Sequence, residues 1–193
     1  VSFALDSGEV MGLVGESGSG KSLTALALMD LLPPSLERQG DITLEGERID
    51  EADDLRMSQL RGSRIALVFQ EPMTALNPLL PIGEQVAEVF RQHRNMMGAQ
   101  AKQEATLVLE RVGLPKDIAP PERLPHELSG GQRQRVVIAM AIALHTAVLI
   151  ADEPTTSLDV TTQRAILDLL RSLAVEDGMA MILITHDLAI LAE

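Results

Sequence analysis

The 193-residue sequence lacks cysteine, tryptophan and tyrosine, and it contains only three lysines. Without cysteine there is no disulfide, no thiol nucleophile and no cysteine-based metal site. The formal net charge of -12 argues against nucleic acid as a partner, because proteins that bind a phosphate backbone present a basic face. No apolar run approaches the roughly 18 residues that cross a bilayer, so we do not expect the chain to enter a membrane itself.

Hydrophobic residues make up 46% of the chain and the mean hydropathy is +0.13, which is typical of a globular protein. The length allows one domain with a proper core, or one domain with a small inserted subdomain. The chain begins at Val1 in an apparent strand, in which Val1, Phe3 and Leu5 alternate with other residues, and it stops at Glu193 in an apparent helix. We therefore expect it to be part of a longer polypeptide.

Short apolar segments alternate with helical patterns along most of the chain. Strands are expected over 10–14, 42–44, 65–69, 148–151 and 181–184, and helices over 22–32, 82–94, 101–112, 130–144 and 161–173. Strands separated by helices predict an α/β fold with a mainly parallel sheet. The segment 76–144 breaks the alternation, since it has no strand pattern and contains a proline-rich hinge. We interpret it as a helical subdomain inserted into the sheet domain.

Residues 15–22 read Gly-Glu-Ser-Gly-Ser-Gly-Lys-Ser, between an apolar strand and a helix. This is the P-loop pattern in the context that such a loop requires. Gly18 and Gly20 allow a tight backbone whose N–H groups point at phosphate oxygens. Lys21 supplies a charge for the β- and γ-phosphates, and the Ser22 hydroxyl can bind Mg²⁺. The alternative, a glycine-rich turn with an incidental lysine, fits the flanking strand and helix poorly.

A predicted buried strand runs directly into Asp152 and Glu153. Ligands of parallel sheets bind beyond the carboxyl ends of the strands. Asp152 is suited to hold Mg²⁺, mostly through water, and Glu153 to orient and deprotonate an attacking water molecule. Two charges capping a surface strand are the alternative, which the neighbouring P-loop disfavours.

The segment Leu128-Ser129-Gly130-Gly131-Gln132 precedes a long helical pattern. Ser129 is a good N-cap, and the glycines expose backbone N–H groups at a second helix start suited to phosphate. One γ-phosphate does not need two such sites in one chain. A dimer resolves this, if the helix start of one subunit closes on the P-loop of the other.

Together these motifs resemble the nucleotide-binding domain of ABC ATPases. Leu128 to Gln132 matches the signature motif of that family, Gln70 its Q-loop glutamine, Ser157-Leu158-Asp159 its D-loop and His186 its switch histidine. The stretch from Phe69 to Pro78 is similar to the oligopeptide, dipeptide and nickel importer ATPases. Leu124 and Ala147 depart from that subfamily at positions away from the chemistry.

The resemblance implies a P-loop NTPase (RecA-like) core over 1–75 and 146–193, a helical subdomain over about 76–145, and ATP and Mg²⁺ as ligands. Catalytic roles fall to Glu153, His186 and Gln70, and metal binding to Ser22, Gln70 and Asp152. The ATP contacts expected within one chain are Gly15, Glu16, Ser17, Gly18, Ser19, Gly20, Lys21, Ser22 and Leu23. Ser129, Gly130, Gly131 and Gln132 would contact ATP across a dimer, with Asp159 near the seam.

Such a domain would be a peripheral motor at the cytoplasmic face of the cell membrane, with transmembrane permease subunits and a second ATPase domain as partners. The region from Met73 to Gln85 would dock on the permease.

Family members stack adenine on an aromatic residue upstream of the P-loop. We expect this residue before Val1, because Phe3, Phe69 and Phe90 look like core positions. A soluble ABC ATPase acting on DNA or ribosomes, and a nucleotide-gated module without turnover, are the alternatives.

Overall fold

The computed structural model describes residues 1–16 and 18–186. Ser17, one of the predicted ATP contacts, and the apparent helix at the end of the chain lie outside these residues. The elements are β1 (Val10–Val14), α1 (Lys21–Leu28), β2 (Thr43–Leu44), β3 (Glu47–Arg48), α2 (Asp54–Leu60), β4 (Ile65–Val68), α3 (Pro72–Ala75), α4 (Ile82–Arg94), α5 (Gly98–Arg111), η1 (Pro125–Glu127), α6 (Gly130–Ile142), β5 (Val148–Asp152), α7 (Val160–Asp177) and β6 (Ala180–Thr185).

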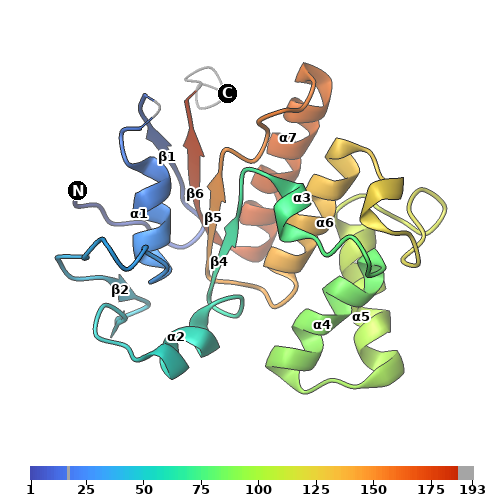
Figure 1. Ribbon diagram of the computed structural model, residues 1–193, viewed down its shortest axis with the longest axis horizontal. Coiled ribbons are helices and arrows are strands. Elements are labelled where there is room, and N and C mark those ends of the chain that lie inside the picture. The colour runs from blue at the N-terminus through green and yellow to red at the C-terminus, as the bar shows by residue number, and fades with distance from the viewer. Residues whose placement is uncertain (17, 187–193) are drawn as a thin grey trace.

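The predicted α/β architecture with a parallel sheet is confirmed. Strands β1, β6, β5 and β4 lie side by side in that order, and all the pairs are parallel. A separate two-stranded antiparallel hairpin is formed by β2 and β3. In Figure 1 the four parallel arrows point to the same upper edge of the molecule, where the carboxyl ends of β1, β4, β5 and β6 lie. Among the described residues, no helix is both long and apolar enough to cross a membrane.

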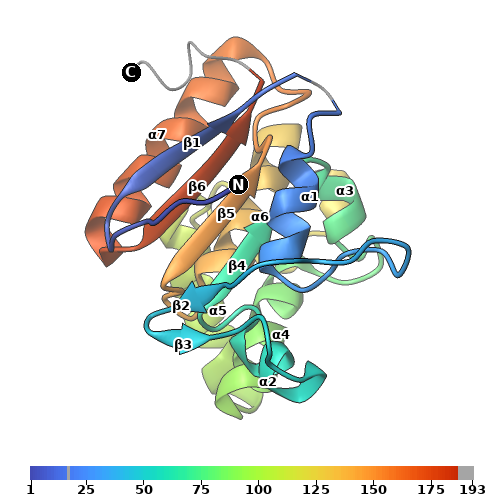
Figure 2. The same cartoon turned by 90° about the vertical axis from the view of Figure 1, so that its left-hand side faces the viewer.

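The two faces of the sheet are covered by different helices, because side chains alternate along each strand. On one face Ile150, Ile182 and Ile184 pack against Ala25 of α1 and against Met29, its C-cap residue. On the other face lies the larger cluster, to which the sheet contributes Ala66, Val68, Leu149, Ala151, Met181 and Leu183, and which continues through α4, α5, α6 and α7. Figures 1 and 2 show α1 on one side of the sheet and α6 and α7 on the other.

Several predicted boundaries shift for local reasons. Helix α1 ends at Leu28 rather than residue 32, because Asp30 adopts a left-handed conformation (φ 53°) and the Leu31 N–H bonds back to the Leu26 carbonyl. The strand expected over Val1 to Leu5 is absent, since no described strand pairs with this segment. Phe90 is buried as predicted, but Phe3 and Phe69 are exposed, so their assignment to the core was wrong.

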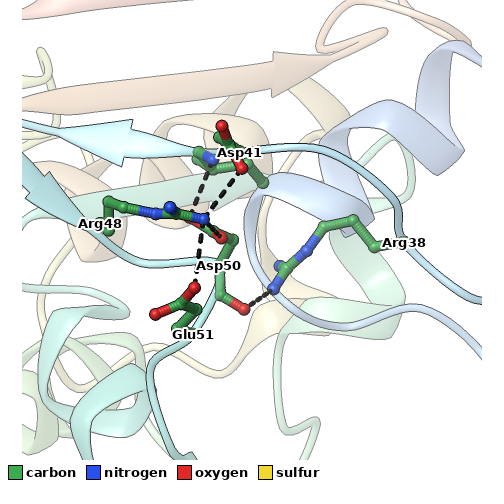
Figure 3. A network of polar contacts seen from close by, with 6 residues as sticks. Arg38, Asp41, Arg48, Asp50 and Glu51 are labelled. Carbon is green, nitrogen blue, oxygen red and sulfur yellow. Dashed lines mark hydrogen bonds and ion pairs between the residues drawn. The ribbon is translucent and has the colours of Figure 1, made fainter.

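An ionic network ties the β2–β3 hairpin to α1 (Figure 3). The Asp50 side chain is only 7% exposed and accepts hydrogen bonds from Arg48 Nη2 at 2.5 Å and the Ile42 N–H at 3.0 Å. Arg38 donates to the carbonyls of Asp50 and of Ala27, in α1, at 2.6 and 3.0 Å. The hydrogen bond from Arg48, followed by that from the Ile42 N–H, holds the pKa of Asp50 well below its ordinary value.

We expect Asp50→Asn to lower the urea midpoint of unfolding at neutral pH. Because the folded-state pKa of Asp50 is lowered, its stabilising effect is complete above the unfolded pKa of about 3.9 and is lost as the pH falls through the folded value. The difference in urea midpoint between the variant and the wild type should therefore become smaller below about pH 4. Asp41→Asn, which removes a more exposed partner of the same arginine, should have little effect. A gap independent of pH would contradict the electrostatic explanation.

Candidate active site

The loop between β1 and α1 closes around the ammonium group of Lys21. Gly18 and Gly20 have φ values of 81° and 94°, in the left-handed region that glycine reaches without strain, and Gly20 is the N-cap of α1. Lys21 is 9% exposed, and its Nζ donates to the carbonyls of Gly15 and Glu16 at 2.8 and 3.0 Å. A cation held by two carbonyls inside a glycine-rich loop at a helix start is suited to receive a phosphate.

Gly15 also approaches the lysine and Ser19 closely. A Cβ at Gly15 would lie 2.7 Å from Ser19 Oγ and 3.8 Å from Lys21 Cδ, so a side chain there would require Ser19 to move. Leu23 is exposed on the first turn of α1. The hydroxyl of Ser22, in the first turn of α1, lies close enough to the carboxylate of Asp152 at the end of β5 to lower its pKa. The two predicted Mg²⁺ ligands are thus neighbours.

Asp152 is the last residue of β5 and is 9% exposed. Its Oδ1 atom is buried without a hydrogen-bond partner. Desolvation is the main effect on this carboxyl and raises its pKa. The nearby Ser22 hydroxyl lowers the pKa, the charge of Glu153 raises it further, and the charge of Lys21 lowers it. An orphaned buried carboxylate oxygen beside a hydroxyl is a donor set that fits Mg²⁺, which prefers oxygen ligands and retains water. No group of three or more acidic or histidine residues within the described ranges could hold a metal by itself, so phosphate and water would supply the remaining ligands.

Three side chains converge on one oxygen of Glu153, its Oε2. The Thr156 hydroxyl donates to it at 2.9 Å and the Gln70 amide at 3.3 Å, and His186 Nδ1 lies 3.3 Å away. Gln70 follows β4, Glu153 follows β5 and His186 follows β6, so three neighbouring parallel strands deliver these groups to one edge. The structure thus brings together the three residues predicted to be catalytic.

Thr156 was missed by the sequence analysis, although the signal was present. It lies three residues after Glu153, and its N–H donates to the Glu153 carbonyl at 3.2 Å to close a turn. Threonine and serine hydroxyls at such turns often bond to nearby groups. Glu153 itself has a φ of 45°, a conformation uncommon for a residue with a side chain.

The signature helix α6 begins with a reciprocal cap. Ser129 Oγ accepts from the Gln132 N–H at 3.2 Å, while the Gln132 side chain accepts from the Ser129 N–H at 3.0 Å. The two glycines also have a packing role that the sequence did not reveal. A Cβ at Gly131 would lie 2.5 Å from Thr162 Cγ2, and one at Gly130 would lie 3.1 Å from Leu158 Cδ2. The start of α6 therefore packs tightly on the start of α7.

Asp159, predicted to lie near a dimer seam, is the N-cap of α7. Its carboxylate accepts from the Thr162 N–H at 3.0 Å and the Thr162 hydroxyl at 2.6 Å. These hydrogen bonds, that from the hydroxyl first, lower the pKa of Asp159. Within the single chain Asp159 therefore has a local capping role.

Comparison with known proteins agrees with this geometry. The family model described as ABC transporter matches residues 1–156. The chain belongs to the ABC transporter family. Its fold matches the dimeric ATP-binding cassette MJ0796 bound to ADP and Pi, with a TM-score of 0.82 and 32% identity over 97% of this chain and 79% of that one.

Two curated ABC relatives match over the whole chain. The oligopeptide transport ATP-binding protein OppD of Bacillus subtilis (strain 168) is 46% identical, and the chain covers 54% of it. The glutathione import ATP-binding protein GsiA of Escherichia coli (strain K12) is 47% identical, and the chain covers 32% of it. The chain thus spans about half the length of the first relative and about a third of the second.

We expect Gly131→Ala to lower the stability of this ABC domain by about 1–3 kcal/mol, because the added methyl group overlaps Thr162 Cγ2. Adding Thr162→Ser, which removes that methyl group and keeps the hydroxyl for Asp159, should restore most of the loss. Gly130→Ala faces only the flexible end of Leu158 and should cost less. Urea unfolding of these three variants and the wild type measures the differences in stability, and a double variant no more stable than Gly131→Ala would contradict the steric argument.

Replacing Asp152 by asparagine should raise the thermal midpoint of the nucleotide-free protein, because a desolvated carboxylate is removed. Its folded-state pKa is raised, so its destabilising effect develops as the pH rises from below the unfolded value of about 3.9 through the folded one. Asp159→Asn is the matched control and should lower the thermal midpoint, because both carboxylate oxygens of Asp159 accept hydrogen bonds at the start of α7. Thermal unfolding at pH 7 checks both; a lower midpoint for Asp152→Asn would contradict the electrostatic reading.

Proposed function

We propose that this ABC domain binds and hydrolyses Mg-ATP to power the import of a peptide or a related small solute. The observation that carries the proposal is the convergence of Gln70, Thr156 and His186 on Glu153, beside an orphaned Asp152 oxygen and a P-loop lysine. A buried carboxylate oxygen without a partner is uncommon in folded proteins, and here it lies in a cluster of ionisable groups at the end of the sheet, as at many functional sites.

In this proposal the loop N–H groups and Lys21 bind the phosphates of ATP. Ser22 and Asp152, with Gln70, would hold Mg²⁺, which supplies charge neutralisation to the phosphate oxygens when bound. Glu153 accepts the proton of the attacking water. Gln70 and His186 are exposed, with 61% of the His186 side chain accessible, so they are free to turn from Glu153 to the nucleotide.

We further propose that two cassettes share each ATP. The P-loop opens α1 on one face of the sheet and Ser129 opens α6 on the other, so the two helix starts of one chain do not face each other. The Ser129 to Gln132 segment of a second ATPase domain would complete the site. The matched MJ0796 structures are dimeric, which supports this arrangement.

The names of the two relatives support import, and a permease as the partner at the cytoplasmic face of a cell membrane. The proposed docking region presents Met73, Leu79 and Leu80 to solvent, with Leu79 82% exposed. Gln85, at the end of that region, is buried instead. Its amide donates to the carbonyls of Asn77 and Leu80 and its oxygen accepts from the Asn77 N–H, which fixes the exposed loop on α4.

A soluble ABC ATPase is the competing function. The net charge of -12 and the importer relatives weigh against a nucleic-acid role. Co-purification of membrane subunits with the full-length polypeptide would separate the two functions.

We expect Glu153→Gln to reduce Mg-ATP turnover by about 10²–10⁴-fold, the usual contribution of a positioned general base, while ATP binding is retained. The wild-type rate should rise faster than linearly with protein concentration if two copies form the site. Phosphate release and equilibrium ATP binding, measured over a concentration series, check both statements.

Glu37→Gln, a change of the same kind at an exposed position away from the strand ends, is the control and should behave as wild type. Unchanged turnover in Glu153→Gln would contradict the assignment of the base. A rate proportional to concentration, with a monomer on a sizing column, would contradict the shared site.

A further inference from the structure

In the turn after β5, the carboxylate of Glu153 is held by a residue of the same turn, Thr156. Thr156 is half-buried, and its hydroxyl makes the shortest of the three contacts to Glu153 Oε2, at 2.9 Å. The same turn is closed by the backbone bond from the Thr156 N–H to the Glu153 carbonyl. The closed turn keeps the Thr156 hydroxyl near the carboxylate of Glu153.

The turn is fixed to the body of the domain. Pro154 and Thr155 are buried. The Gln163 amide of α7 donates to the Thr155 carbonyl at 3.2 Å, and the Glu153 N–H donates to the Ile184 carbonyl of β6 at 3.0 Å. Thr156 is therefore presented by a rigid element, as groups that position others require.

The two other contacts to Oε2 come from exposed side chains on separate loops. Gln70 and His186 belong to the ends of β4 and β6, and in the proposed function both turn to the nucleotide. Once they do, Thr156 is the one member of this trio that still donates to Glu153. Its bond to Oε2 leaves Oε1 to accept a proton from water.

We propose that Thr156 is a positioning residue, which orients the Glu153 carboxylate so that Oε1 faces the attacking water. The inference rests on the proposed ATPase function. In that reaction the water oxygen bonds to the γ-phosphorus, the bond from that phosphorus to the bridging oxygen of ADP breaks, and the water proton passes to Oε1. Thr156 touches neither water nor phosphate and acts through Glu153 alone.

The bond also restrains a backbone that is unfavourable by itself. Glu153 and Ser157 have φ values of 45° and 73°, and such conformations persist only where surrounding contacts enforce them. Thr156 lies between them. Its hydroxyl is the only side-chain hydrogen bond that joins the two ends of this turn among the described contacts.

The test compares Thr156→Val, which keeps the shape and removes the hydroxyl, with Thr156→Ser, which keeps the hydroxyl. Thr156→Val should lower kcat about tenfold to a hundredfold, as expected for a lost hydrogen bond to a charged group, with KM and ATP affinity unchanged. Thr156→Ser should retain most of the rate. A crystal structure of Thr156→Val with a non-hydrolysable ATP analogue bound should show the Glu153 carboxylate turned away from its position in the wild-type complex, because Gln70 and His186 no longer hold it there.

The same substitution is then made in Glu153→Gln. If Thr156 acts only by orienting the Glu153 carboxylate, it has no carboxylate to orient in Glu153→Gln. Adding Thr156→Val to that variant should therefore change the residual rate less than twofold. An equal fall in both backgrounds would overturn the inference in favour of a structural role for the turn. So would wild-type turnover in Thr156→Val. A wild-type protein that binds ATP without hydrolysing it would overturn the proposed function, and the inference with it.

Discussion

The pairing of β5 with its two parallel neighbours is the constraint on which the candidate site depends. Asp152 lies opposite Ile184 of β6, and Val68 of β4 lies opposite Ala151. The strands therefore end nearly level, and the residues that follow them meet at one edge. A slip of one residue would move every side chain of a strand to the other face of the sheet. Each face packs a different set of apolar side chains against its own helices, isoleucines on one face and alanine, valine, leucine and methionine on the other. A slip would disrupt both layers, so the apolar core fixes the position of the polar edge.

That edge contains groups that disfavour folding. An orphaned carboxylate oxygen lies in Asp152, Glu153 has a left-handed backbone, and the buried ammonium of Lys21 is satisfied by two carbonyls although it can donate three hydrogen bonds. A divalent cation would pair with the Asp152 oxygen, and a phosphate would accept the remaining hydrogen bond of Lys21. A ligand that binds the folded state alone stabilises it, so the domain should be least stable without nucleotide. The extensive apolar packing on both faces of the sheet offsets the strain.

The sequence predicted the parts whose cause is local. The P-loop glycines, the Ser129 cap and the alternating strand residues each follow from the properties of a few neighbouring residues. Val1, Phe3 and Leu5 alternate too, but a strand needs a partner, and alternation does not show whether one is available. The end of α1 depends on one backbone angle at Asp30, which composition does not reveal. Long-range contacts were the least predictable: the need for glycine at position 131 comes from Thr162, which is distant in sequence.

These long-range contacts change how the proposed dimer is understood. Gly131 abuts Thr162, Thr162 bonds with Asp159, and Asp159 follows the turn that holds Glu153. The start of the signature helix is thus packed against the start of α7, which follows the Glu153 turn in the chain, while α1 and the P-loop lie across the sheet. If each signature helix contacts the nucleotide of the opposite cassette, a displacement of that helix must disturb the Glu153 turn behind it. The two ATP sites of a dimer would then be linked by rigid packing within each chain, with no additional linking element needed.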